Sequence, residues 1–245
     1  MSRDMDNRRG AYAGPSERTQ LRVSGGLMVA GLVVNAVFTI FHPAGAEDTH
    51  KVIFSKYAQS GSWVAVDLGQ FVGVSLALGG LLVLYRAMRS SEQPPVLPYL
   101  AAAATIATTG TWAVLQGLDG VGLKQAVVAW DAASGVEKAT RFANAETVRW
   151  LEWGIQSYFR VLLGLTFVLF GAAILAGGLI AAWLGWVAVV AGVLSAAIGV
   201  DVGYSGLASP LQDLLSIIFP IVAFVFAVGV FVLGFRGDGQ RAARR

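Results

Sequence analysis

Six long apolar segments separated by polar stretches set the pattern of this chain. They cover residues 23–41, 63–85, 97–117, 154–176, 179–200 and 210–235. Each is close to the ~20 apolar residues that an α-helix needs to cross a bilayer. Lipid offers backbone groups no hydrogen-bond partners, and these segments are too long for the strands of a membrane barrel. The pattern therefore predicts an all-α, polytopic membrane protein with six transmembrane helices.

The polar connections between the segments differ in length and character. Residues 1–20 are rich in arginine and lack periodicity, which is typical of a disordered tail. The 118–153 connection has apolar residues at helical spacing as far as Trp130, followed by charges interleaved with apolar residues. It predicts a short interfacial helix on the membrane surface and then a helix that continues into the fourth span. The predicted organisation is a six-helix domain over 21–236 and a basic tail at 237–245.

Most of the arginines and lysines lie on one side of this predicted topology. The two tails and the connection after the second span carry more of them than the 42–62 and 118–153 connections do. Because basic residues favour the cytoplasmic side, both termini are predicted to be cytoplasmic and these two connections extracytoplasmic. An alternative for the first segment is a signal peptide with a small-residue cleavage site at 44–46.

Polar residues form stripes along three of the predicted spans, in the halves nearest the outside. The longest runs from Arg149 to Arg160 and the second from Thr105 to Asp119, with steps of three and four that keep each stripe on one helix face. Ionisable groups inside lipid usually face the bundle interior and have partners. The stripes therefore predict one outward-facing polar pocket. Its predicted ligand-binding residues are Asp67, Gln70, Trp112, Gln116, Trp153, Gln156 and Arg160.

Arg160 is the most distinctive residue of this set. It lies about 9 Å into the fourth span at 1.5 Å per residue, a depth that Asp67 and Asp213 approach from the same side. One interpretation is a structural ion pair of Arg160 with Asp67, Asp213 or Glu152. The other is a guanidinium clamp for a carboxylate or phosphate ligand.

The tryptophans near the outer boundary also allow two interpretations. They could form the aromatic belt of a membrane interface. They could instead build a cage for a cation or an apolar ring, for which Trp112 and Trp153 are preferred because they lie on polar stripes. The inner halves of the spans are apolar and carry small residues suited to tight packing. A pocket closed below argues against a channel.

Catalytic and cofactor motifs are missing from the sequence. There is no cysteine, which excludes disulfides, iron–sulfur clusters and thiol chemistry. His42 and His50 fall in the outer connection at a spacing that is no metal signature, and we interpret both as loop-surface residues. The spans hold no histidine that could bind a transmembrane haem or serve as the base of a serine protease. We therefore expect no cofactor and no metal.

Three segments resemble stretches of bacterial six-span membrane proteins that are classed only as domains of unknown function. They are residues 54–63, 117–125 and 145–153. The resemblance implies a multi-pass protein of the bacterial cytoplasmic (inner) membrane and implies no activity.

The leading functional hypothesis is binding of a small amphipathic molecule or a lipid headgroup in the outward-facing pocket. One alternative is a structural or accessory subunit of a membrane complex. A second is an intramembrane carboxylate-dependent enzyme or proton-coupled carrier that uses Asp67 or Glu152, although no motif indicates a reaction. The expected partners are membrane lipid, a small amphipathic ligand or another membrane protein. Nucleic acid is not expected, because the basic residues lie mostly at the chain ends.

Overall fold

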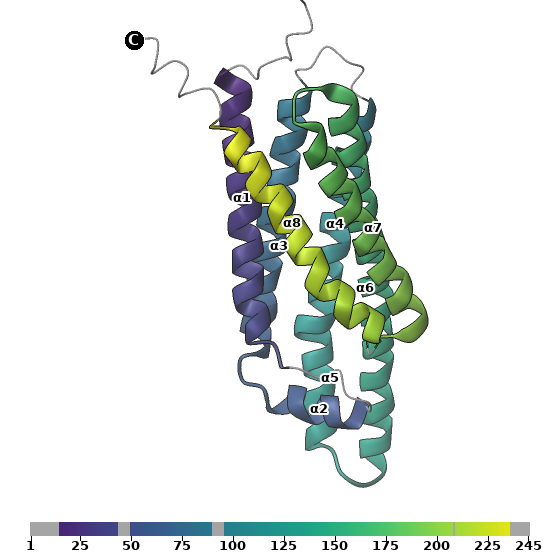
Figure 1. Cartoon of the computed structure of the whole chain (residues 1–245). Helices are drawn as coiled ribbons and strands as arrows, with labels where there is room; N and C mark the ends of the chain where they lie inside the picture. Colours follow the sequence, from purple (N-terminus) through teal and green to yellow (C-terminus); the bar gives the residue numbers. More distant parts are fainter. Residues whose placement is uncertain (1–14, 44–49, 90–95, 208, 236–245) are drawn as a thin grey trace, which may run out of the picture.

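The protein is mostly helical where the structure describes it (Figure 1). The computed structural model describes residues 15–43, 50–89, 96–207 and 209–235. Within these ranges all regular elements are helices, which confirms the predicted all-α class. Five of the described helices are long and apolar enough to cross a membrane, as a multi-pass membrane protein requires. They are α1 (Pro15–Ile40), α3 (Trp63–Met88), α6 (Gly135–Gly177), α7 (Ala182–Ser205) and α8 (Pro210–Leu233).

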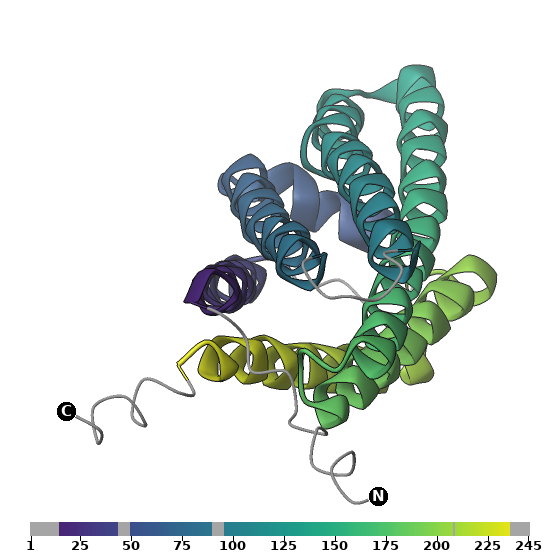
Figure 2. The ribbon, with the colours of Figure 1, turned by 90° about the horizontal axis from the view of Figure 1, so that it is seen from above.

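A sixth bundle helix, α4 (Val96–Gln116), is not among these five. Its 21 residues are enough to cross a bilayer, but its alanines and threonines make it less apolar. It packs between α3 and α6, while α8 runs diagonally across the bundle from α1 to α7 (Figures 1 and 2). The start of α1 and the end of α8 lie together, where Arg22 Nε donates to the carbonyl oxygen of Gly234 at 2.8 Å.

Small residues bring the bundle helices into close contact. A Cβ added to Gly192 of α7 would lie 2.6 Å from the carbonyl oxygen of Gly164 on α6, and one added to Gly171 would lie 2.6 Å from that of Gly185. Gly31 of α1 and Gly73 of α3 meet in the same way. Close backbone approach of this kind is how helices associate in lipid, where burial of apolar surface gives no driving force.

At one end α6, together with the helical continuation of α4, extends beyond the other bundle helices (Figure 1). The 43 residues of α6 span roughly 65 Å at 1.5 Å per residue, about twice the hydrocarbon thickness of a bilayer. This confirms the helix predicted to run into the fourth span. On the other side, α4 continues through the π-helical segment η1 (Gly117–Leu123) into α5 (Lys124–Ala132), which packs on α6.

The predicted interfacial helix corresponds to α5, and its placement on the membrane surface stays a prediction. The apolar side chains of Leu123, Val127 and Trp130 are buried against protein in a second core, together with Phe54 and Ala145. The face of α5 that carries these side chains meets protein, while Val128 stays exposed, and α5 extends the line of α4. The helix that lies across this end is α2 (His50–Gln59), within the stretch predicted to be a loop (Figure 1).

We call α2, η1, α5 and residues 135–153 of α6 the cap, and the place where the cap meets α3 and α4 the junction.

The predicted tail boundary also needs correction, because residues 15–20 belong to α1, where Pro15 occupies a favoured first-turn position. The predicted basic tail at 237–245 and the cleavage site at 44–46 lie outside the described residues.

Candidate functional site

Charged side chains meet at the junction although the surroundings are apolar. Asp67 of α3 is only 2% exposed, and Arg149 and Glu152 of α6 are each 4% exposed. Asp119 comes from η1, and His42 follows the end of α1. Four separate parts of the chain therefore contribute ionisable groups to one place, which is the arrangement expected of polar groups that have a function inside a membrane protein.

The π-helical turn of η1 positions Asp119. A Cβ added to Gly120 would lie 2.7 Å from Cβ of Asp67, so a glycine is needed for the η1 backbone to approach α3 this closely. The indole Nε1 of Trp63 donates to the carbonyl oxygen of Asp119 at 3.0 Å and fixes η1 on the start of α3. Short π-helical stretches often occur at functional sites, and this one presents a carboxylate to a second carboxylate.

His42 completes a cluster of donor atoms. Its ring lies 4.8 Å from the ring of Trp63 and 6.3 Å from that of Tyr57, measured between centroids. One ring nitrogen of His42 and one carboxylate oxygen each of Asp67 and Asp119 all lie within 4.8 Å of one another. We call these three residues the donor cluster. The interpretation of His42 as a loop-surface residue is wrong, because the side chain is half-buried against aromatic rings.

Arg149 and Glu152 form a buried ion pair beside the donor cluster. Arg149 Nη1 donates to Glu152 Oε2 at 2.6 Å, and each side chain is 5% exposed. The guanidinium also lies over the rings of Tyr57 and Trp153, at 5.5 and 5.9 Å from their centroids. Arg149 is thus paired with Glu152, and no ion pair joins it to either aspartate of the donor cluster in the described part of the chain.

Three of the four carboxylate oxygens of these two aspartates are buried without a hydrogen-bond partner in the described part of the chain. Both carboxylate oxygens of Asp67 and Oδ1 of Asp119 are buried without one. A buried charge is costly unless it is paired and hydrogen-bonded. The donor cluster therefore combines two carboxyl groups with free oxygen lone pairs that have no protein partner among the described residues.

Burial and neighbouring charges shift the titration of three groups around the junction. Burial raises the pKa of Asp119 well above its usual range, and the nearby carboxylates of Glu152 and Asp67 raise it further. Burial also lowers the pKa of His42, and the charge of Arg149 contributes in the same direction. Burial raises the pKa of Tyr57 to about 12. All three shifts favour the neutral form of the side chain.

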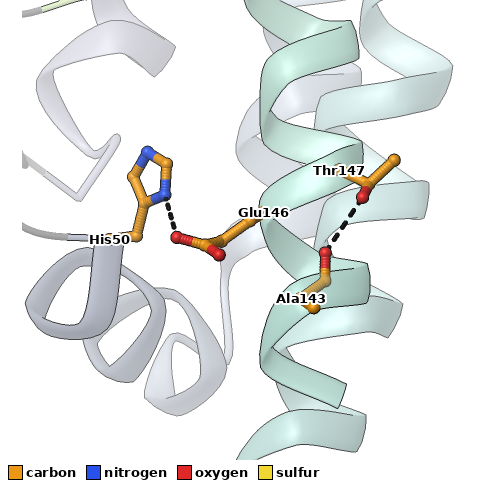
Figure 3. A network of polar contacts seen from close by, with 4 residues as sticks. All are labelled: His50, Ala143, Glu146 and Thr147. Carbon is orange, nitrogen blue, oxygen red and sulfur yellow. Dashed lines mark hydrogen bonds and ion pairs between the residues drawn. The ribbon is translucent and has the colours of Figure 1, made fainter. Parts of the chain in front are cut away.

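Two polar contacts hold α2 over the junction. His50 Nδ1 and Glu146 Oε1 of α6 are 2.9 Å apart (Figure 3). Lys124 Nζ donates to the carbonyl oxygens of Tyr57, Ala58 and Ser60 at 2.7, 2.9 and 2.7 Å. These are carbonyls of the last turn of α2 and the residue after it, which helix geometry leaves without intrahelical partners, and a cation there also complements the helix dipole.

Three of the seven predicted ligand-binding residues lie at or beside the junction. Asp67 belongs to the donor cluster. Gln116 ends α4, and its Oε1 is buried without a hydrogen-bond partner among the described residues. The same holds for Nε1 of Trp153, whose ring lies 5.5 Å from that of His50.

The other four predicted residues do not join this group. Gln70 donates to Thr39 at 3.0 Å in an exposed position. Trp112 donates to the carbonyl of Phe71 at 3.3 Å and packs on the Phe159 ring. Gln156 is half-buried on α6. Gln70 and Trp112 thus have other neighbours, and the structure brings together only part of the predicted lining.

Arg160 does not form the predicted ion pair. Its guanidinium lies over the rings of Phe159 and Phe219, 6.0 and 5.5 Å from their centroids, and it bonds to no carboxylate among the described residues. Glu152 is bonded to Arg149 instead, and Asp213 is exposed at the start of α8. The carboxylate that lies beside Asp67 in the donor cluster is Asp119, which the enzyme hypothesis did not include.

The structure also contains an apolar hollow of about 380 Å³ on the surface between α7 and α8. It lies where α7 begins and α8 ends, at the opposite end of the bundle from the cap (Figure 1). Its lining carries no polar side chain other than an indole, as expected of a surface that faces lipid. The lining residues are Trp183, Phe224, Val225, Val228, Gly229, Val232 and Leu233.

The chain matches no family model, no curated protein and no solved structure. Its predicted resemblance to six-span bacterial families therefore stays a prediction. The function has to be argued from the chemistry of the junction.

Proposed function

We propose that this is a multi-pass membrane protein that binds a cation at the junction, through the carboxylates of Asp67 and Asp119. The observation that carries the proposal is the charge balance. Three carboxylates and one guanidinium lie within electrostatic reach of one another, and the guanidinium is bonded to Glu152. A cation placed between the two aspartates would compensate the charge that Arg149 leaves over.

Energetics support a ligand in preference to a purely structural role. A buried ionised group without a partner costs several kcal/mol even after relaxation. Groups of this kind in membrane proteins mark ligand, ion or proton sites. If Asp67 served only to join helices, it would be expected to hydrogen-bond to a neighbour, as Ser24 does to the carbonyl of Gly80 and Ser195 to that of Arg160.

This proposal narrows the amphipathic-ligand hypothesis. A ligand that enters the junction with an anionic headgroup would meet Asp67, Asp119 and Glu152 and be repelled. A positively charged group, either a metal ion or the ammonium of an amphiphile, meets the complementary charge. The proposed partner is therefore a small cation, with membrane lipid around the bundle.

The proposed topology has six spans, with α4 as the third, and cytoplasmic termini in a bacterial inner membrane. Two observations support it. The described chain begins and ends at the same end of the bundle, as an even number of crossings requires (Figure 1). The arginines are concentrated at that end and in the adjoining tails, which favours its cytoplasmic location. The cap and the junction would then face the outside.

A cation panel tests the proposal on the purified full-length protein in detergent. The thermal midpoint is measured by tryptophan fluorescence with Ca²⁺, Mn²⁺, Zn²⁺ or dodecylammonium, at matched ionic strength. A ligand present at about 100 times its Kd should stabilise the folded protein by about 2.7 kcal/mol. At least one cation should raise the midpoint of the natural protein and of the control variant Asp213→Asn. The effect should be lost in Asp67→Asn and Asp119→Asn.

Two results would refute the proposal. One is that no cation of the panel raises the midpoint of the natural protein. The other is that the same increase persists in Asp67→Asn and Asp119→Asn, which would place the binding elsewhere.

A further inference from the structure

We infer that the cation is a first-row divalent metal ion bound by His42, Asp67 and Asp119, an inference that rests on the proposed function. The three residues come from the end of α1, from α3 and from η1, and their donor atoms lie within 4.8 Å of one another. Both oxygens of Asp67, which is 2% exposed, are buried without a partner in the described part of the chain. This departs from the expectation, drawn from the sequence, that the protein holds no metal.

The spacing of the donor atoms suits a shared ion. Nitrogen and oxygen donors lie about 2.0–2.2 Å from a zinc ion, so two donors of one ion can be at most about 4.4 Å apart. The donor atoms lie within 4.8 Å of one another, so the movement needed to reach this limit is at most a few tenths of an ångström. Small side-chain rotations can provide that movement while α1, α3 and η1 stay where they are.

The donor types select the class of metal. One imidazole and two carboxylates form a mixed nitrogen and oxygen set, and the protein has no cysteine that could add a thiolate. Ca²⁺ and Mg²⁺ prefer oxygen donors alone, whereas imidazole favours first-row metals such as Zn²⁺, and carboxylates also suit Mn²⁺. Two carboxylates balance the charge of a divalent ion, and three protein ligands leave at least one position for water or a substrate.

Trp63 connects two of the three ligands. Its ring packs against the ring of His42, and its indole N–H donates to the backbone carbonyl of Asp119. Metal ligands are commonly fixed by such supporting contacts, and their loss typically lowers metal affinity 10–100-fold. Trp63 is therefore a positioning residue. Replacing it with phenylalanine removes the hydrogen bond and keeps a ring against His42.

The inference is tested by metal titrations of the full-length protein in nanodiscs, after the protein has been treated with a chelator. Isothermal titration with Zn²⁺, Mn²⁺ and Co²⁺ should give one ion per chain for at least one of the metals. His42→Gln, Asp67→Asn and Asp119→Asn should each weaken binding of that metal at least tenfold, and Trp63→Phe should weaken it less. His50→Gln and Asp213→Asn are the matched controls, one histidine of the cap and one exposed aspartate, and should bind as the natural protein does.

The possible results separate the metal site from the broader proposal. If His42→Gln binds every metal as tightly as the natural protein does, the metal site is wrong. The metal site is also wrong if only Ca²⁺ or dodecylammonium stabilises the protein and this effect needs Asp67 and Asp119 but not His42. In that case the proposed cation-binding function would still stand. If neither a metal ion nor dodecylammonium binds, the metal site and the proposed cation-binding function are both wrong. A monodisperse gel-filtration peak for each variant excludes misfolding as the cause of lost binding.

Discussion

Replacing Arg149 with methionine should strongly destabilise the protein. The guanidinium is the hydrogen-bonding partner of Glu152 at 2.6 Å, and both side chains are 5% exposed. It also lies over the rings of Tyr57 and Trp153. Methionine fills a similar volume, so the substitution removes the charge while it preserves much of the packing.

The magnitude follows from what the substitution leaves behind. Glu152 would remain buried without its partner, and Asp67 and Asp119 would lose the only guanidinium that is close to them among the described residues. Removing one partner of a buried pair typically costs about 3–5 kcal/mol. Glu152→Gln should cost less, about 1–3 kcal/mol, because it weakens a charged hydrogen bond and removes one of the three carboxylates.

Arg160→Met is the matched control on the same helix. Its guanidinium contacts two phenylalanine rings and no carboxylate among the described residues. The loss is then limited to cation–π contacts worth about 0.5–2 kcal/mol, and removal of a partly buried charge offsets some of it. Arg160→Met should therefore change the free energy of unfolding by less than about 1.5 kcal/mol.

Equilibrium unfolding in mixed detergent and SDS micelles, followed by tryptophan fluorescence, measures these differences. The expected order of destabilisation is Arg149→Met, then Glu152→Gln, then Arg160→Met. The proposed charge balance of the junction would be refuted if Glu152→Gln were more destabilising than Arg149→Met. It would also be wrong if the two arginine variants lost equal stability.

Three further predictions concern the packing, the cap and the topology. Gly192→Ala should destabilise the contact of α7 with α6, because the new Cβ would lie 2.6 Å from a backbone oxygen. Gly154→Ala, where a Cβ would meet open space, should stabilise the protein by about 0.5–1 kcal/mol. The thermal midpoints of the two variants should therefore shift in opposite directions. Lys124→Met should remove three hydrogen bonds at the end of α2 and speed amide exchange there, and unchanged exchange would contradict this role. A membrane-impermeant thiol reagent applied to intact cells should label Ser60→Cys and not Ser90→Cys, and the reverse pattern would overturn the proposed topology.

The sequence predicted the class of fold because length and composition decide it. Segments of about 20 apolar residues have few alternatives to a membrane-spanning helix. The continuous helix into the fourth span was also predictable, since charged and apolar residues alternate at helical spacing before Trp153. The placement of α5 was not predictable, because an apolar face such as that of Leu123 and Val127 looks the same whether it meets lipid or protein.

The candidate site could be predicted only in part, for a similar reason. Periodicity identifies which face of a helix is polar, and it placed Asp67 and Asp119 on such faces. It does not identify the neighbour that this face meets. Glu152 was therefore one of the three partners predicted for Arg160, although it is bonded to Arg149. His42 lies just beyond the end of α1 and belongs to no periodic pattern. Its contact with α3 and η1 depends on the fold of the cap.

The most direct test of the account compares Asp67→Asn with the natural protein, with and without a saturating concentration of the stabilising cation. Without the cation, Asp67→Asn should unfold at an equal or higher temperature, because it removes a buried group that has no partner. With the cation, the order should reverse, because only the natural protein gains binding free energy. An Asp67→Asn variant that is less stable by the same amount under both conditions would contradict the account and make Asp67 a structural residue.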